Sequence, residues 1–250
     1  MLPTVASRPS PGAPLSLGAD EVHVWHAALN QPAAAVRDLS RSLAPDETAR
    51  AARFHFQRHR DDFVVARGVL RALLGRYLNV APSGLRFSYT RYGKPYLPDE
   101  IRHDGLCFNV SHSHERALYA FTRGREIGVD VEYVRPEMAT EQIAERFFSA
   151  GEVASLRSLP AGLQPRGFFN CWTRKEAYIK ARGEGLSLPL DCFDVSLLPG
   201  EPAALLATRD DPGEALRWSL HELPADEGYV AALAVAGGDL RVTHRRWPAP

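Results

Sequence analysis

Two short stretches of the chain carry side chains whose types and spacing suit phosphate chemistry. In the first, residues 128–132 read G-V-D-V-E, so that valines alternate with Asp130 and Glu132. This alternation is typical of a half-buried β-strand and places both carboxylates on one face, with their Cα atoms about 7 Å apart. Strands are poor in Asp and Glu. Two acids on one strand face therefore indicate a role beyond folding, such as holding an ion between them.

The second stretch, residues 169–180, reads F-N-C-W-T-R-K-E-A-Y-I-K and has the periodicity of a helix. At about 100° per residue, Phe169, Trp172 and Ile179 share one arc. Glu176 falls inside the same arc, and Lys180 follows one turn later. A carboxylate on an apolar stripe faces inward, where it is protonated or destabilising unless a cation keeps it ionised.

Together these stretches supply three carboxylates, Asp130, Glu132 and Glu176. A set of oxygen donors suits Mg²⁺ or Mn²⁺ rather than zinc. Because Mg²⁺ also binds substrate phosphates, the natural substrate would be a phosphate ester or anhydride. The alternative is structural: the strand acids line a solvated sheet face, and Glu176 forms an ordinary helical salt bridge with Lys180.

The same residues carry a family resemblance. The motif G-V-D-V-E, then F-F-S-A-G-E ending at Glu152, then W-T-R-K-E-A-Y-I-K ending at Lys180, resembles the 4′-phosphopantetheinyl transferases of the Sfp type. The match extends from about Leu43 to Leu197. It implies an enzyme that transfers phosphopantetheine from coenzyme A to a serine of an apo acyl or peptidyl carrier protein, in polyketide, peptide or fatty-acid assembly.

The resemblance also implies roles for individual residues. Asp130, Glu132 and Glu176 match the metal ligands of the family, with Mg²⁺ or Mn²⁺ as the ion. Glu176 also matches its proposed general base, and Lys180 matches a lysine beside the pyrophosphate. Glu152 matches a carboxylate that some members bring near the metal.

Further residues match the coenzyme A site of the family. Lys94 and Pro95 lie in the turn that packs on the adenine, and Ser111 and His112 match a pair that contacts the phosphates. Basic residues for the 3′-phosphate are expected in the helices of the first half, where the pattern departs from the family. The candidates are Arg50, Arg60 and Arg67. An exposed helical arginine is otherwise a solvated charge, and His112 with His114 would alternatively suit zinc.

The elements that must position these residues alternate along the chain. A strand near residues 22–26 precedes helices at 45–56 and 61–78 and strands at 85–90, 106–110 and 117–122. The order recurs with a strand at 127–134, helices at 141–159 and 167–182, the latter ending at the C-cap candidates Gly183 and Gly185, and strands at 192–197, 216–223 and 229–236. The repeat predicts an α+β fold of two similar halves, and the resemblance implies a pseudo-dimer of two subdomains with the active site at their interface.

We therefore expect a flexible tail at 1–20, an N-terminal subdomain at 21–124 and a C-terminal subdomain at 125–250 that carries the metal motifs. The formal net charge is zero, so no general attraction to nucleic acid or membrane is expected. The three cysteines form no CxxC pair and indicate free thiols in the cytoplasm. We expect a monomer.

Two other functions use the same residues. The carboxylates would also serve a metal-dependent hydrolase of a nucleotide pyrophosphate, which would consume coenzyme A without a carrier protein. The chain would alternatively be a non-catalytic module that binds coenzyme A, in which case changing Glu176 would leave binding intact.

Overall fold

The computed structural model describes residues 12–91, 93, 95–98 and 105–247. Its helices are α1 Ala33–Ser40, α2 Pro45–Ala52, α3 Gln57–Leu78, α4 Glu141–Phe147, α5 Ala150–Ser158 and α6 Gln164–Arg182. Its strands are β1 Glu21–Ala28, β2 Ser88–Tyr89, β3 Pro95–Tyr96, β4 Leu106–Ser113, β5 Arg116–Arg123, β6 Ile127–Tyr133, β7 Phe193–Val195, β8 Leu205–Thr208, β9 Trp218–Glu222, β10 Tyr229–Ala236 and β11 Arg241–Arg246. Among these helices none is long and apolar enough to span a bilayer.

The element order repeats within the chain. In the first half β1 is followed by α1–α3, the β2–β3 hairpin, β4 and β5; in the second half β6 is followed by α4–α6, the β7–β8 hairpin, β9 and β10. The pairing repeats as well, because β1–β5–β4 and β6–β10–β9 are both antiparallel in the same order. The predicted α+β pseudo-dimer is confirmed.

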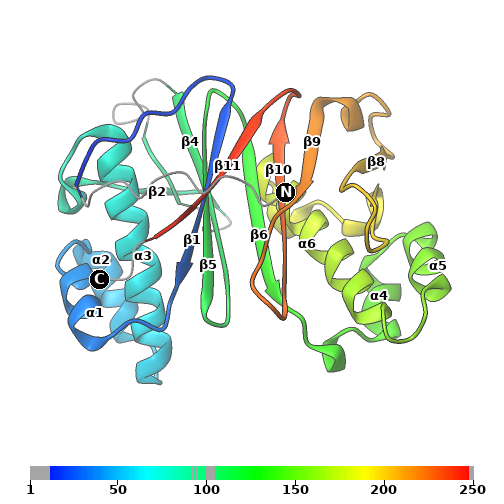
Figure 1. Ribbon diagram of the computed structural model, residues 1–250, viewed down its shortest axis with the longest axis horizontal. Helices are drawn as coiled ribbons and strands as arrows, with labels where there is room; N and C mark the ends of the chain where they lie inside the picture. The colour runs from blue at the N-terminus through cyan, green and yellow to red at the C-terminus, as the bar shows by residue number, and fades with distance from the viewer. Residues whose placement is uncertain (1–11, 92, 94, 99–104, 248–250) are drawn as a thin grey trace.

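The two sheets lie side by side between two groups of helices. Helices α1–α3 cover one flank and α4–α6 the other (Figure 1). Within the described residues, one apolar cluster fills the space under α3 and includes Leu73, a second joins the two sheets and includes Val129, and a third lies under α6 and includes Ile179. The halves are therefore fused through a shared apolar layer.

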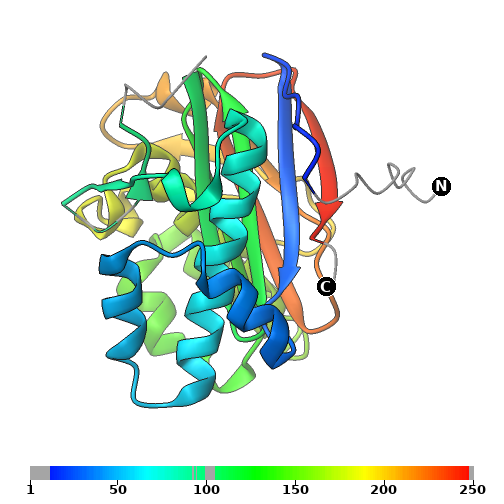
Figure 2. The same ribbon diagram turned by 90° about the vertical axis from the view of Figure 1, so that its left-hand side faces the viewer.

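The strand β11 leaves the second half and pairs in parallel with β1, which gives the first sheet the order β11–β1–β5–β4 (Figure 2). The sequence did not predict this strand, because its residues R-V-T-H-R-R are polar, as edge strands often are. Of the expected tail, residues 1–11 lie outside the described residues, and Leu15 and Leu17 are buried in the first core. The limits of the tail (1–20) and of the two subdomains (21–124 and 125–250) stay predictions.

The helix predicted at 141–159 is wrong as a single element. It is two helices, α4 and α5, which are separated at Phe148 and Ser149. Ser149 accepts a hydrogen bond from the backbone N–H of Glu152, and the Glu152 carboxylate accepts one from the backbone N–H of Ser149. This reciprocal capping box begins a new helix, and its signal, S-x-x-E, was present in the sequence. The short helix α1 and the hairpin strands β3 and β8 were also missed.

Candidate active site

The helix α6 touches β6 at Gly128, and this contact builds the site. A Cβ atom at Gly128 would lie 2.0 Å from the carbonyl oxygen of Ala177 and 2.4 Å from the backbone nitrogen of Ala181. Only glycine permits this approach. It brings the helical pair Glu176 and Lys180 beside the acids of the strand. The expectation of a half-buried strand is therefore wrong at this point, because α6 covers the acid-bearing face.

Side chains from β4, β6 and α6 meet there. Asp130 is 2% exposed, and its Oδ1 lies 2.6 Å from the Lys180 Nζ. The Ser111 hydroxyl donates to the same oxygen at 2.7 Å, and Ser113 donates to Glu132 Oε2 at 2.7 Å. Lys180 thus pairs with the strand acid from a different element.

The charges of the site shift one another's pKa values. Burial is the main reason that the pKa of Glu176 is raised to about 7; Lys180 opposes this rise, and Asp130 and Glu132 contribute to it. Burial and Asp130 also raise the pKa of Glu132. Desolvation by itself lowers the pKa of Lys180, but the three carboxylates outweigh it and raise that pKa. The carboxylates therefore outnumber the Lys180 ammonium, and Arg135 adds a second positive charge near Glu132.

This donor set fits a hard cation in its chemistry. Asp130 Oδ2 is buried and has no hydrogen-bond partner within the described part of the chain, and all the candidate ligands are carboxylate oxygens, which Mg²⁺ prefers. However, among the described residues no group of three or more His, Cys, Asp or Glu side chains is gathered closely enough to hold a metal. The acids are neighbours, with the Lys180 ammonium against Asp130.

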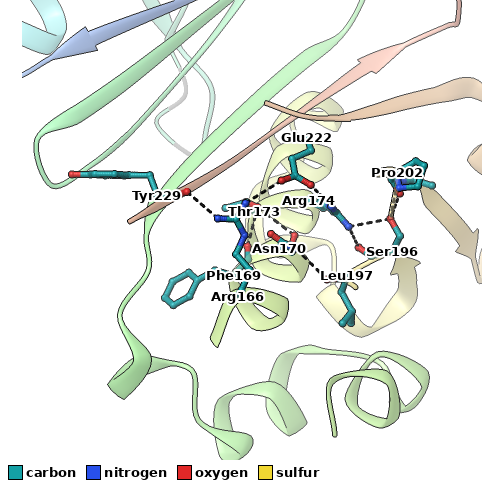
Figure 3. Close-up of polar contacts among 11 residues, drawn as sticks. Arg166, Phe169, Asn170, Thr173, Arg174, Ser196, Leu197, Pro202, Glu222 and Tyr229 are labelled. Carbon is teal, nitrogen blue, oxygen red and sulfur yellow. Dashed lines mark hydrogen bonds and ion pairs between the residues drawn. The ribbon is translucent and has the colours of Figure 1, made fainter. Parts of the chain in front are cut away.

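Polar contacts fix α6 against the rest of the second half. The Arg174 guanidinium donates to the Ser196 carbonyl at 2.7 Å and to Glu222 Oε2 at 3.0 Å. Arg166 reaches the other oxygen of Glu222 at 3.0 Å, and Asn170 donates to the Leu197 carbonyl at 3.2 Å (Figure 3). Because these bonds tie α6 to β9 and to the segment after β7, the helix has one position relative to β6.

A cavity of about 450 Å³ opens beside the site. Glu176 and Lys180 form part of its wall, and Pro95 and Asn109 come from the first half. The lining is mostly apolar, with a few polar groups, as in many small-molecule sites. Its place between residues of both halves agrees with the predicted interface site.

A second cavity of about 650 Å³ shares Gly93 with the first. Arg50 and Arg53 are the cations among its described lining residues, and Tyr89 is also part of its wall. The guanidinium of Arg67 lies 5.9 Å from the centre of the Tyr89 ring. Asp46 and Glu47 also line this cavity, so it brings two guanidinium groups and two carboxylates close to the first cavity.

Buried hydrogen bonds and ion pairs already occupy some of the predicted basic residues. Arg67 Nε lies 3.4 Å from the buried Glu47, which also pairs with Arg71 at 2.6 Å. Arg60 donates to the Phe54 carbonyl at 3.3 Å and so holds the connection between α2 and α3; it is not among the described residues that line the two cavities.

The two residues of the predicted phosphate pair point in different directions. Ser111 faces Asp130, whereas His112 is exposed. Although the His112 side chain reaches solvent, the protein atoms around its imidazole partly desolvate it and lower its pKa, and the charge of Lys180 lowers that pKa further. Lys94, the predicted adenine contact, lies outside the described residues, while its neighbour Pro95 begins β3.

Glu152 belongs to the interior of the second half. Its Oε2 lies 2.8 Å from the buried Lys175 Nζ and accepts the Ser149 N–H, while its Oε1 accepts the backbone N–H of Val195 at 2.8 Å. Both oxygens are therefore engaged in caps and ion pairs. The structure gives Glu152 a folding role and does not place it with Asp130.

Asn109 and Ser113 were not among the predicted site residues. Both accept backbone N–H groups of β6, and Ser113 also contacts Glu132. The available signal was the alternation of polar residues in N-V-S-H-S, which marks one strand face. The partner of that face depends on the tertiary fold.

Comparison with known proteins identifies the family of the chain. The family model described as "4'-phosphopantetheinyl transferase superfamily" matches residues 126–234, and the one described as "4'-phosphopantetheinyl transferase, N-terminal" matches residues 25–122. The chain is 46% identical to the 4′-phosphopantetheinyl transferase HetI of Nostoc sp., over 89% of this chain and 91% of that protein. It is 34% identical to the 4′-phosphopantetheinyl transferase Sfp of Bacillus subtilis, over 62% of this chain and 66% of that protein.

Proposed function

The chain belongs to the 4′-phosphopantetheinyl transferase superfamily, and we propose that it transfers 4′-phosphopantetheine from coenzyme A to a serine of an apo acyl or peptidyl carrier protein, with Mg²⁺. The observation that supports this proposal most is the meeting of Asp130, Glu132, Glu176 and Lys180 beside a cavity that both halves line. That arrangement suits attack on a pyrophosphate.

In the proposed reaction the serine hydroxyl attacks the β-phosphorus of coenzyme A. A new oxygen–phosphorus bond forms, the pyrophosphate bond breaks, and 3′,5′-adenosine bisphosphate leaves. The serine proton passes to Glu176, whose carboxylate forms part of the cavity wall beside Lys180. The ammonium of Lys180 neutralises charge on the phosphate oxygens.

We assign Mg²⁺ to Asp130, Glu132 and Glu176, with Mn²⁺ as a substitute. The orphaned Asp130 Oδ2 and the excess negative charge support this assignment. When bound, the ion polarises the phosphoryl oxygens. The chain would supply these ligands from two elements, Asp130 and Glu132 from β6 and Glu176 from α6.

Coenzyme A would extend from the assigned Mg²⁺ ligands through both cavities. The mostly apolar cavity beside Pro95 suits its uncharged parts, and the second cavity, with Arg50 and Arg53, suits a terminal phosphate. Of the other basic candidates, Arg67 contacts the ring of Tyr89 in the second cavity, and Arg60 is not among the described residues that line either cavity. His112, near Lys180, remains a phosphate contact in the proposal.

We expect the protein to act as a monomer in the cytoplasm. Each chain already supplies both halves of the site, so no second copy is needed. The cysteines Cys107, Cys171 and Cys192 are free thiols, which agrees with a reducing compartment.

A panel of apo carrier proteins incubated with coenzyme A and Mg²⁺ tests the proposal. Mass spectrometry should show one phosphopantetheine arm added to a carrier, and none when its target serine is replaced by alanine. Consumption of coenzyme A without any carrier would instead identify a hydrolase. Tight binding of coenzyme A with no turnover across the panel would identify a binding module.

A further inference from the structure

The strands β4 and β6 form a seam that contains side chains instead of a backbone ladder. The Val129 N–H donates to Asn109 Oδ1 at 2.9 Å, and the Tyr133 N–H donates to Ser113 Oγ at 3.2 Å. Between them the Val131 N–H donates to the Ser111 hydroxyl at 3.4 Å. Each pair is separated by 20 residues, so the strands run parallel with one fixed register. The seam joins the edge of the first sheet to the edge of the second.

Each β4 side chain in the seam suits the β6 residue opposite it. Opposite Gly128, which has no side chain, lies Asn109, whose amide oxygen accepts a backbone N–H and donates no hydrogen bond. Where β6 presents an acid, the β4 residue is a serine, and a hydroxyl accepts the backbone N–H and donates to the carboxylate at once. Ser111 donates to Asp130 and Ser113 donates to Glu132, both at 2.7 Å.

The two acids do not depend equally on this arrangement. Asp130 receives Lys180 as well as Ser111. For Glu132, Ser113 is the hydrogen-bond donor that the described residues provide. A glutamate has a longer and freer side chain than an aspartate, so it loses its orientation when its donor is removed.

Resting on the function proposed above, we infer that Ser113 is a positioning residue for Glu132. From the first half of the molecule it fixes the orientation of a carboxylate carried by the second half. Its hydroxyl holds Oε2 in place so that the carboxylate is directed at the ion. Partners of this kind change metal affinity or activity by roughly 10–100-fold when removed.

The test compares three variants, Ser113→Ala, Ser113→Thr and Ser219→Ala. The first removes the hydroxyl, and the second keeps a hydroxyl at the same position of the strand. Ser219 lies on β9, at the edge of the second sheet opposite β6, and its Oγ donates to the Gly237 carbonyl at 2.6 Å. Ser219→Ala therefore removes one partly buried hydroxyl bond without touching an acid. Direct Mn²⁺ binding, followed by electron paramagnetic resonance, and the Mg²⁺ dependence of transfer are measured for each.

Ser113→Ala should weaken Mn²⁺ binding roughly tenfold or more and raise the Mg²⁺ concentration needed for half-maximal transfer, with the KM for coenzyme A unchanged. Ser113→Thr should restore both, and Ser219→Ala should bind Mn²⁺ as the wild type does. Wild-type binding by Ser113→Ala, or equal effects of both alanine variants, would overturn the inference.

A crystal structure of Ser113→Ala separates this inference from the proposed function. If the wild type transfers nothing, the proposed function fails, yet the position of the Glu132 carboxylate in the variant still decides the role of Ser113. A carboxylate that stays in place without the hydroxyl refutes positioning, and a displaced one supports it.

Discussion

Glu176 is the buried carboxylate that α6 contributes to the site. It is one turn before Lys180 on α6 and is close enough to Asp130 and Glu132 for both to add to the rise that burial causes in its pKa. A buried carboxylate with a raised pKa is a typical general base in an active site. We therefore expect proton transfer to depend on Glu176.

Replacing Glu176 with glutamine should abolish transfer and leave the fold intact. The amide keeps the shape but accepts no proton, so the rate should fall by roughly a hundredfold or more. The rate is measured by mass spectrometry of the carrier, and folding by circular dichroism and thermal melting. Glu201→Gln, a change at an exposed loop residue, is the control and should behave as the wild type. A Glu176→Gln enzyme with a normal rate would remove this residue from the chemistry.

The raised pKa of Glu176 also predicts how the metal-free protein responds to pH. Because burial raises the folded-state pKa from 4.5 to about 7, the folded protein holds this proton more tightly than the unfolded chain does. The stabilisation is complete below pH 4.5 and is lost as pH rises through 7. Without Mg²⁺, the melting temperature of the wild type should fall relative to Glu176→Gln over that window. A constant difference between the two would contradict the raised pKa.

At the scale of elements, the contact between β6 and α6 decides whether the acids and the lysine meet. Gly128 allows the backbone of α6 to touch the strand. The bonds of Arg174 and Asn170 hold the same face of the helix nearer its N-terminus, where it meets β9 and the segment after β7. A shift of α6 away from β6 would therefore break these hydrogen bonds.

Gly128→Ala should push α6 away from β6. The added methyl group would meet backbone atoms of Ala177 and Ala181, and overpacking of this kind typically costs about 1–3 kcal/mol. Thermal melting should show the loss of stability, and transfer should fall because Glu176 and Lys180 move with the helix. Gly162→Ala is a matched control, because nothing lies within 4 Å of its added Cβ. If both variants keep wild-type stability and rate, the close contact is not needed.

At the scale of the whole molecule, β11 returns from the second half to the sheet of the first. His244 on this strand contacts His26 on β1, with Nδ1 and Nε2 3.2 Å apart. Two imidazoles at that distance share one hydrogen bond only when at least one is neutral. Burial, then the charges of His244 and Arg246, lower the pKa of His26 to about 4.

This pair predicts a loss of stability in acid. Since the folded-state pKa of His26 is depressed from 6.5 to about 4, its stabilisation is present above pH 6.5 and is lost as pH falls through 4. Thermal melting of the wild type across this window should show a steeper decline than that of His26→Gln, which cannot take the extra proton. If the melting temperatures of both proteins fall equally with pH, protonation of His26 does not control the acid stability of the protein.

Much of this molecule follows from local pattern. The alternation in residues 128–132 and the helical period around Trp172 predicted β6 and α6, and Gly183 caps α6 in the left-handed conformation as predicted. The repeated order of elements predicted two similar halves. These features depend on neighbours in the sequence, so the sequence alone was sufficient for them. The capping box at Ser149 is equally local, so the start of α5 could also have been predicted from the sequence.

Other features were decided by contacts between residues far apart in the chain. The sequence offered Glu176 as the partner of Lys180, but the fold sets the lysine 2.6 Å from Asp130. It also pairs Glu152 with Lys175, directs Ser113 at Glu132 and attaches the charged strand β11 to β1. A periodic pattern shows which face a side chain occupies, but it does not show what packs against that face. The partner of each of these charged groups was decided only when elements far apart in the chain packed together.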